Sequence, residues 1–163
     1  MTRTLDIWWD GRLVGQLTQD KHGELGFAYA RAWLDDEAAQ PLSASLPKRT
    51  EPFSRRECRP FFGGLLPEES QRDAAAQALG VSRANDFALL DRLGGDVAGA
   101  LQLLPPGEGP TAPAPDQRPI PLDDEGLIRV LDALPVRPLL AGEEGLRLSL
   151  AGAQSKVPVV LVE

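Results

Sequence analysis

The chain has 163 residues, of which 42% are hydrophobic and 25% charged, and this ordinary globular composition argues against disorder along its whole length. Its formal net charge of −7 argues against a nucleic-acid-binding surface, which normally needs clustered Lys and Arg. One cysteine and one histidine, Cys58 and His22, exclude an internal disulfide, a cysteine-based metal site and a histidine-rich metal site.

Targeting signals are not evident in the sequence. The N-terminus has no apolar signal core, and no stretch approaches the length needed to span a membrane. We therefore expect a cytoplasmic protein without a membrane partner.

The chain opens with a predicted antiparallel β-meander. Residues 5–9 and 13–17 are apolar or alternate, and Asp10-Gly11 between them suits the positive φ angles of a tight hairpin turn. A third strand is predicted at 25–29, after a polar turn that contains His22. The aromatic residues of this part are expected to form its core and rim: Trp8, Trp9, Phe27, Tyr29 and Trp33.

Two further strands and three helices are predicted before residue 105. Residues 42–46 and 98–104 are assigned as strands, the first because it alternates with period two. Helical spacing replaces this pattern from Glu57 onward, and Gly80 and Gly94-Gly95 are predicted C-terminal helix signals. The predicted helices begin near Glu57, near Pro67 and near Phe87.

The densest basic cluster lies in the first of these helices. Arg55, Arg56 and Arg59 stand beside Glu57, and so short a cluster favours a solvated helix face over a phosphate-binding patch. Cys58, in the same stretch, is predicted to be a small buried hydrophobe.

A proline-rich stretch divides the chain. Residues 105–121 hold seven prolines and are predicted to form an extended, semi-rigid linker. An amphipathic helix is predicted at 123–134, followed by a β-hairpin with strands at 146–150 and 157–162. The fold class is therefore α+β. An N-terminal α/β domain is predicted at 1–104, and residues 122–163 are predicted to form the first part of a second unit.

The hairpin loop is the segment with chemistry. Small residues at its tip would let backbone N–H groups approach a phosphate, with Lys156 adding a positive charge. Taken alone this signal is weak, because the loop has one glycine and no GxxxxGK[ST] spacing, and an ordinary hairpin is the favoured interpretation. The loop residues are Ala151, Gly152, Ala153, Gln154, Ser155 and Lys156.

Several segments together change this balance, because in order and spacing the chain resembles the N-terminal part of the HipA family. These proteins are serine/threonine kinase toxins of bacterial type II toxin–antitoxin pairs. The resembling segments are WWDGRLVGQLT, PLSASLP (41–47), FFGGLLPEE (61–69), DFALLDRLGGDVAGALQLLP (86–105) and LSLAGAQSK (148–156).

The resemblance implies that residues 122–163 start a kinase-like fold whose loop at 151–156 covers the phosphates of ATP. It implies that Ser149 is the autophosphorylation site, whose modification silences the kinase. It also implies that the catalytic aspartate and the Mg²⁺ ligands lie downstream of Glu163. We therefore expect no catalytic or metal-binding residue in these 163 residues, and no activity from them alone.

Two functions follow from the resemblance. In the first, the chain is the N-terminal part of a kinase that uses ATP and Mg²⁺ to phosphorylate a translation protein, with glutamyl-tRNA synthetase as the substrate that the family suggests. Its partner would be a helix-turn-helix antitoxin of the HipB type, through which it would meet DNA indirectly. In the second, it is a non-enzymatic regulatory subunit of a split system that binds a separate kinase core. The presence of the loop at 151–156, which a pure regulator does not need, favours the first.

Overall fold

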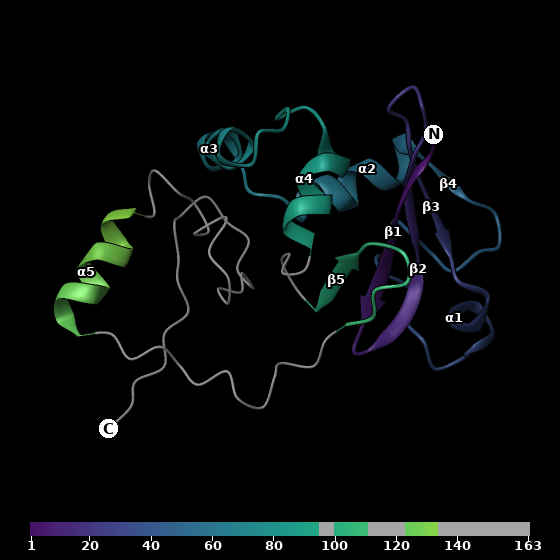
Figure 1. Cartoon of the computed structure of the whole chain (residues 1–163). Coiled ribbons are helices and arrows are strands. Elements are labelled where there is room, and N and C mark those ends of the chain that lie inside the picture. Colours follow the sequence, from purple (N-terminus) through teal and green to yellow (C-terminus); the bar gives the residue numbers. More distant parts are fainter. Residues whose placement is uncertain (95–99, 111–122, 134–163) are drawn as a thin grey trace.

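The chain folds around a five-stranded antiparallel sheet with the strand order β4-β3-β2-β1-β5 (Figure 1). It is described by a computed structural model that covers residues 1–94, 100–110 and 123–133. The α+β prediction is confirmed. The strands are β1 (Arg3–Trp9), β2 (Arg12–Gln19), β3 (Leu25–Tyr29), β4 (Phe53–Ser54) and β5 (Leu101–Leu104).

The predicted meander is present. Asp10 and Gly11 have φ angles of 47° and 74°, as the tight turn between β1 and β2 requires. A register shift between Ile7 and Trp8 marks a bulge just before this turn. Phe27, Tyr29 and Trp33 are buried in the core, whereas Trp8 and Trp9 are half-buried at its rim, as predicted.

One row of apolar side chains crosses four strands and forms the centre of the core. Leu5 pairs with Leu17, Leu17 with Phe27, and Phe27 with Phe53. Each of these side chains is at most 2% exposed, and burying such a side chain contributes about 1.5–3 kcal/mol. The same face receives Phe62, whose ring centroid lies 5.4 Å from that of Phe27.

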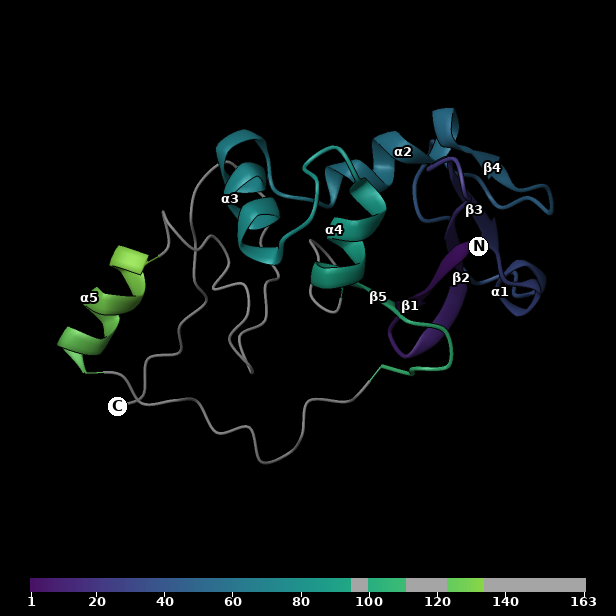
Figure 2. The same cartoon turned by 45° about the horizontal axis from the view of Figure 1, so that its top comes forward.

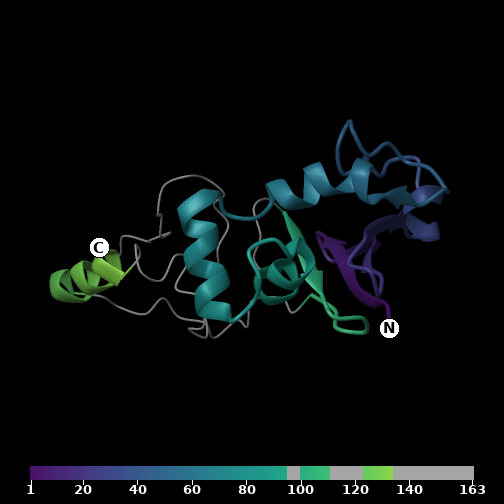
Figure 3. The ribbon, with the colours of Figure 1, turned by 90° about the horizontal axis from the view of Figure 1, so that it is seen from above.

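Two helices cover this face of the sheet, with α2 packed on β3 and α4 on β5, and Figures 2 and 3 show both on one side of it. Helix α3 packs against α4, and α5 lies apart from the sheet in these views. The helices are α1 (Arg31–Asp35), α2 (Arg55–Gly64), α3 (Glu69–Leu79), α4 (Asp86–Leu93) and α5 (Asp124–Ala133).

The helix ends follow the local sequence. Gly80 ends α3 in the left-handed conformation with φ 65°, as predicted. Gly94 ends α4, as predicted, but with an ordinary φ of −66° rather than the left-handed conformation, and Gly95 lies outside the described residues. A Cβ at Gly94 would lie 2.8 Å from Cβ of Leu103, so the glycine allows α4 to approach β5 closely.

The predicted strand at 42–46 is wrong. These residues form a tight turn with a single bridge between Ser43 and Leu46, and Phe53–Ser54 supplies the edge strand instead. The turn is fixed by Tyr29, whose hydroxyl accepts the Leu42 N–H at 2.9 Å and donates to the Leu46 carbonyl at 2.5 Å. The alternation of apolar and polar residues therefore reflects a turn with Leu46 buried beneath it.

The region around the predicted linker is described only in part. β5 begins at Leu101, and residues 98–99 of the predicted strand lie outside the described residues. Pro105 starts a turn in which its carbonyl accepts the Glu108 N–H at 3.0 Å, and the Gly107 N–H donates to Oδ2 of Asp6 at 3.2 Å. The first residues after β5 are therefore attached to the sheet.

The remaining predicted elements have different outcomes. The helix predicted at 123–134 is confirmed as α5, whereas the hairpin predicted at 146–162 lies outside the described residues. None of the helices within 1–94 and 123–133 is long and apolar enough to cross a bilayer.

Candidate functional site

The predicted phosphate loop, Ala151–Lys156, and the predicted autophosphorylation site, Ser149, lie outside the described residues. The helix that precedes them begins after Asp123, whose Oδ1 accepts the Gly126 N–H at 2.7 Å. In the part of the chain that is described, charged side chains gather instead where α2, α3 and α4 meet.

A buried carboxylate, Asp86, joins these three helices. Only 2% of its side chain is exposed, and Nε of Arg59 in α2 donates to its Oδ2 at 2.7 Å. Arg72 in α3 donates to its other oxygen. The side chain of Arg72 is 15% exposed and that of Arg59 50%, so the pair with Arg72 is the more desolvated of the two.

The residue before Asp86 connects α4 to the sheet. Asn85 caps α4, because its Oδ1 accepts the Ala88 N–H at 3.0 Å. The same oxygen accepts a hydrogen bond at 3.1 Å from Nε2 of Gln19, at the end of β2. The start of α4 is thereby held by neighbours on two sides.

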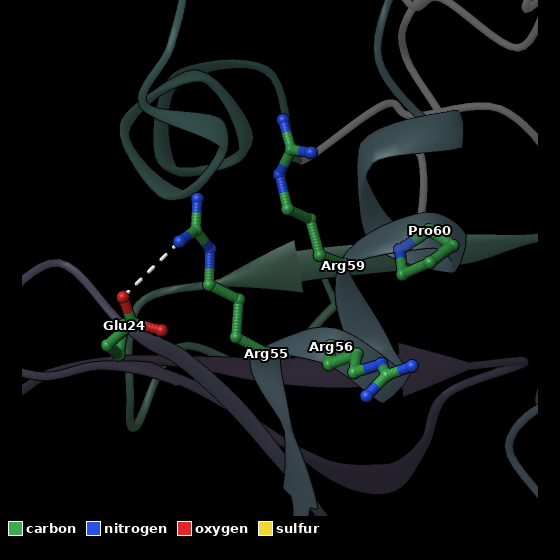
Figure 4. Close-up of a pocket in the computed structure, with 5 residues that line it drawn as sticks. All are labelled: Glu24, Arg55, Arg56, Arg59 and Pro60. Carbon is green, nitrogen blue, oxygen red and sulfur yellow. Dashed lines mark hydrogen bonds and ion pairs between the residues drawn. The ribbon is translucent and has the colours of Figure 1, made fainter.

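An open hollow of about 590 Å³ lies beside α2 (Figure 4). Nη1 of Arg55 lies 3.3 Å from Oε1 of Glu24, and about half of each side chain is exposed. Figure 4 shows Arg55 and Arg59 extending in a similar direction from α2, whereas Arg56 points elsewhere. The hollow is lined by Glu24, Arg55, Arg56, Arg59 and Pro60.

The helix turn that carries these arginines is fixed by a capping box. Oε2 of Glu57 accepts hydrogen bonds from the backbone N–H and the hydroxyl of Ser54 at 2.9 and 2.7 Å. Arg49 donates to its other oxygen at 2.8 Å. These contacts, the Ser54 N–H foremost, lower the pKa of Glu57 to about 2, so it is ionised at neutral pH.

The basic residues of this site were predicted from the sequence, but the acidic residues that they contact were not. Arg55, Arg56 and Arg59 lie on an exposed helix face, as predicted, but their partners Glu24 and Asp86 were missed. The capping-box spacing Ser54-x-x-Glu57 and an Asn before an apolar run were available as helix-start signals. No local signal relates Asp86 to Arg59, 27 residues away.

The single histidine and single cysteine have structural surroundings. His22 is exposed in a turn where its backbone N–H donates to Oδ1 of Asp20 at 2.8 Å, as predicted for a turn residue. Cys58 is fully buried, also as predicted, and burial raises the pKa of its thiol to about 11. Within 1–94, 100–110 and 123–133, no three His, Cys, Asp or Glu side chains form a group that could hold a metal ion.

The Cys58 thiol is expected to resist alkylation in the folded protein. With a pKa near 11 its thiolate fraction at pH 8 is about a hundredfold below that of an ordinary cysteine, and burial also blocks access. Labelling with iodoacetamide at pH 8, followed by mass spectrometry, should therefore be at least that much slower in buffer than in guanidinium chloride. Equal rates in the two conditions would show that α2 does not bury the thiol.

The comparisons with known proteins converge on one family. Residues 5–104 match the family described as HipA N-terminal domain. A Sinorhizobium fredii protein named "Putative kinase Y4mE" is 76% identical over 163 residues, which are 99% of this chain and 39% of that protein. The serine/threonine-protein kinase toxin HipA of Shewanella oneidensis is 30% identical over 157 residues, 96% of this chain and 35% of the relative.

A solved structure agrees with these relatives. It is the complex of HipA, HipB and operator DNA from Shewanella oneidensis, matched with a TM-score of 0.66 and 28% identity over 91% of this chain and 33% of the matched chain. The chain therefore spans between a third and two-fifths of the length of these proteins.

Proposed function

Because this chain belongs to the HipA family through its N-terminal domain, we propose that it is the N-terminal part of a HipA-like toxin kinase acting in the cytoplasm. The kinase uses ATP and Mg²⁺ to phosphorylate serine or threonine of a translation protein, with glutamyl-tRNA synthetase as the first substrate to test. The observation that carries the proposal is the family match over residues 5–104. The alignment with the HipA toxin of Shewanella oneidensis extends this similarity to 96% of the chain.

In this proposal the two parts of the chain have different roles. Residues 1–104 form the α/β domain, 105–121 link it to the next unit, and 122–163 start the kinase-like fold. The loop Ala151–Lys156 covers the ATP phosphates, with Lys156 contributing charge and the small residues allowing close approach of backbone N–H groups. The Mg²⁺ ligands and the catalytic aspartate lie downstream of this loop, as in the family.

The proposed partner is a helix-turn-helix antitoxin of the HipB type. The matched Shewanella structure, which contains HipA with HipB and operator DNA, supports this choice. The net charge of −7 supports contact with DNA through the antitoxin rather than through this chain.

The proposed function is tested on the natural gene product that contains these 163 residues. Its intact mass defines the protein to purify, and ³²P transfer from ATP to glutamyl-tRNA synthetase then measures activity. We expect transfer by a product that extends through a kinase core and none by the 163 residues alone, since the Mg²⁺-holding groups come later in the family. Turnover by the 163-residue chain alone would contradict this assignment.

Ser149→Ala in that full gene product is expected to remove autophosphorylation and the self-inactivation that follows it. A phosphate at Ser149 would place about two negative charges beside the loop that holds the ATP phosphates, so its loss keeps the loop competent. Phosphate stoichiometry by mass spectrometry after incubation with ATP measures the effect. Ser45→Ala, at an exposed turn serine, is the matched control; unchanged stoichiometry in Ser149→Ala would exclude the site.

A regulatory subunit is the second candidate function. It is favoured by the core of residues 1–104, whose buried side chains come from the sheet and from helices α1 to α4. An intact mass equal to 163 residues, together with saturable binding to a separately encoded kinase core, would establish this function instead.

A further inference from the structure

We propose that the hollow beside α2 binds an acidic segment of a protein partner, with carboxylates of that segment pairing with Arg55 and Arg56. The proposal concerns a surface of the N-terminal domain and needs neither ATP binding nor the loop at 151–156. It is therefore tested on the 163-residue chain, and its outcome is separate from that of the kinase assignment.

Positive charge is in excess at this surface although the whole chain is acidic. Arg55, Arg56 and Arg59 line the hollow with one acid, Glu24. Asp86, the partner of Arg59, is shared with Arg72. Arg55, Arg59 and Arg72 thus share two carboxylates, and Arg56 has no carboxylate partner among the described residues, which leaves donors for a further anion.

Arg55 and Arg56 differ from Arg59 in how strongly their guanidiniums are held by carboxylates of the chain itself. Arg59 is held at 2.7 Å by a buried carboxylate, whereas Arg55 contacts Glu24 at 3.3 Å with both side chains near half exposure. Arg56 is exposed and makes no side-chain hydrogen bond or ion pair within the described residues. Arg55 and Arg56 extend in different directions from α2 (Figure 4), so a segment with several carboxylates is needed to meet both guanidiniums, and it can do so without breaking a buried interaction.

The surface is also preorganised. The capping box of Ser54 and Glu57 fixes the first turn of α2, so the backbone positions of Arg55 and Arg56 are set before any ligand binds. Less conformational entropy is then lost on binding than from a flexible loop.

The chemistry of the hollow favours carboxylates over a nucleic-acid backbone. Glu24 already shows a carboxylate in contact with Arg55, within the same hollow (Figure 4). A duplex needs several phosphate contacts along a groove, and acids flank this cluster in a chain of net charge −7. An acidic protein segment needs only the few contacts that Arg55 and Arg56 offer.

The test is fluorescence anisotropy of a fluorescein-labelled hexaglutamate peptide titrated with the full chain at low ionic strength. Arg55→Glu/Arg56→Glu is expected to weaken binding by about tenfold or more, because two attractions become repulsions. The control is Arg31→Glu/Arg92→Glu, which makes the same charge change at exposed residues of α1 and α4 and should stay within about twofold. Arg55→Gln/Arg56→Gln gives a milder variant should the reversal disturb folding.

Glu24→Gln distinguishes a binding surface from general charge or fold effects. It removes the internal competitor of Arg55, so affinity for the peptide should rise about two- to fivefold. Glu37→Gln, at an exposed acid in the turn after α1, removes the same charge elsewhere and should change affinity less. A fall in affinity with Glu24→Gln, or equal losses in the two double variants, would overturn the proposal. Tighter binding of random-sequence duplex DNA through the same arginines would also overturn it.

Discussion

Gly15→Ala is expected to destabilise the N-terminal domain by about 3 kcal/mol or more, the largest effect of a single methyl group that we predict. Gly15 lies in β2 opposite Tyr29 of β3. A Cβ at this position would overlap the carbonyl oxygen of Ala28 and lie 2.9 Å from both Cα of Tyr29 and Cε2 of Phe27. Two of these atoms belong to the backbone of the neighbouring strand, so they cannot move without opening the β2–β3 ladder.

The effect should appear as a lower thermal midpoint. For a domain of this size about 3 kcal/mol corresponds to a fall of roughly 12–24 °C, measurable by tryptophan fluorescence or circular dichroism. Gly64→Ala is the matched control, because a Cβ there meets nothing within 4 Å and the residue lies in α2. It should be neutral or stabilising by up to about 1 kcal/mol. A Gly15→Ala midpoint equal to that of the Gly64 variant would refute the close strand approach.

Asp86→Ala is expected to cost about 3 kcal/mol, because it leaves Arg72 largely buried without its counter-charge. The estimate lies at the low end of values for broken buried pairs, since Arg59, the second partner, is half exposed and can be solvated. Loss of the carboxylate also removes the contact that links α4 to both α2 and α3. Urea unfolding followed by tryptophan fluorescence measures the change in the free energy of unfolding.

An exposed ion pair supplies the comparison for Asp86. Asp73 contacts Arg83 at 2.8 Å, but the two side chains are 50% and 62% exposed. Asp73→Ala should therefore cost less than about 1 kcal/mol. Equal losses in the two variants would mean that the burial of Asp86 contributes nothing. A lower slope of the urea transition in Asp86→Ala would indicate that less surface is exposed in the transition or that unfolding is no longer two-state.

Local patterns predicted most of the fold. The Asp10-Gly11 turn, the three strands of the meander and the glycine end of α3 each depend on a few neighbouring residues, and each was found. The strand predicted at 42–46 was wrong because alternation of apolar and polar residues does not distinguish a short strand from a turn, and of the apolar residues in this turn only Leu46 is buried. There, a distant hydroxyl, that of Tyr29, determines the conformation.

The candidate site was less accessible to sequence reasoning. The basic cluster on α2 could be read from the sequence, but its effect depends on which acids approach it. Glu24 lies just before β3, 31 residues from Arg55, and Asp86 lies in α4, 27 residues from Arg59. Such partners are set by how α2, α3 and α4 pack, for which a single sequence gives no direct signal. The family relation of the whole chain was predicted from several weak motifs in order, and the comparisons confirm it.

The turn at Pro105–Glu108 determines where the polypeptide departs from the domain. Asp6 is 7% exposed in β1, and its carboxylate accepts both the Gln16 side chain at 2.8 Å and the Gly107 N–H at 3.2 Å. The segment that follows β5 is thus hydrogen-bonded to β1, an interior strand of the sheet. A unit joined to the chain after this turn is therefore tethered from a fixed point on the sheet, which limits the volume that the unit can reach.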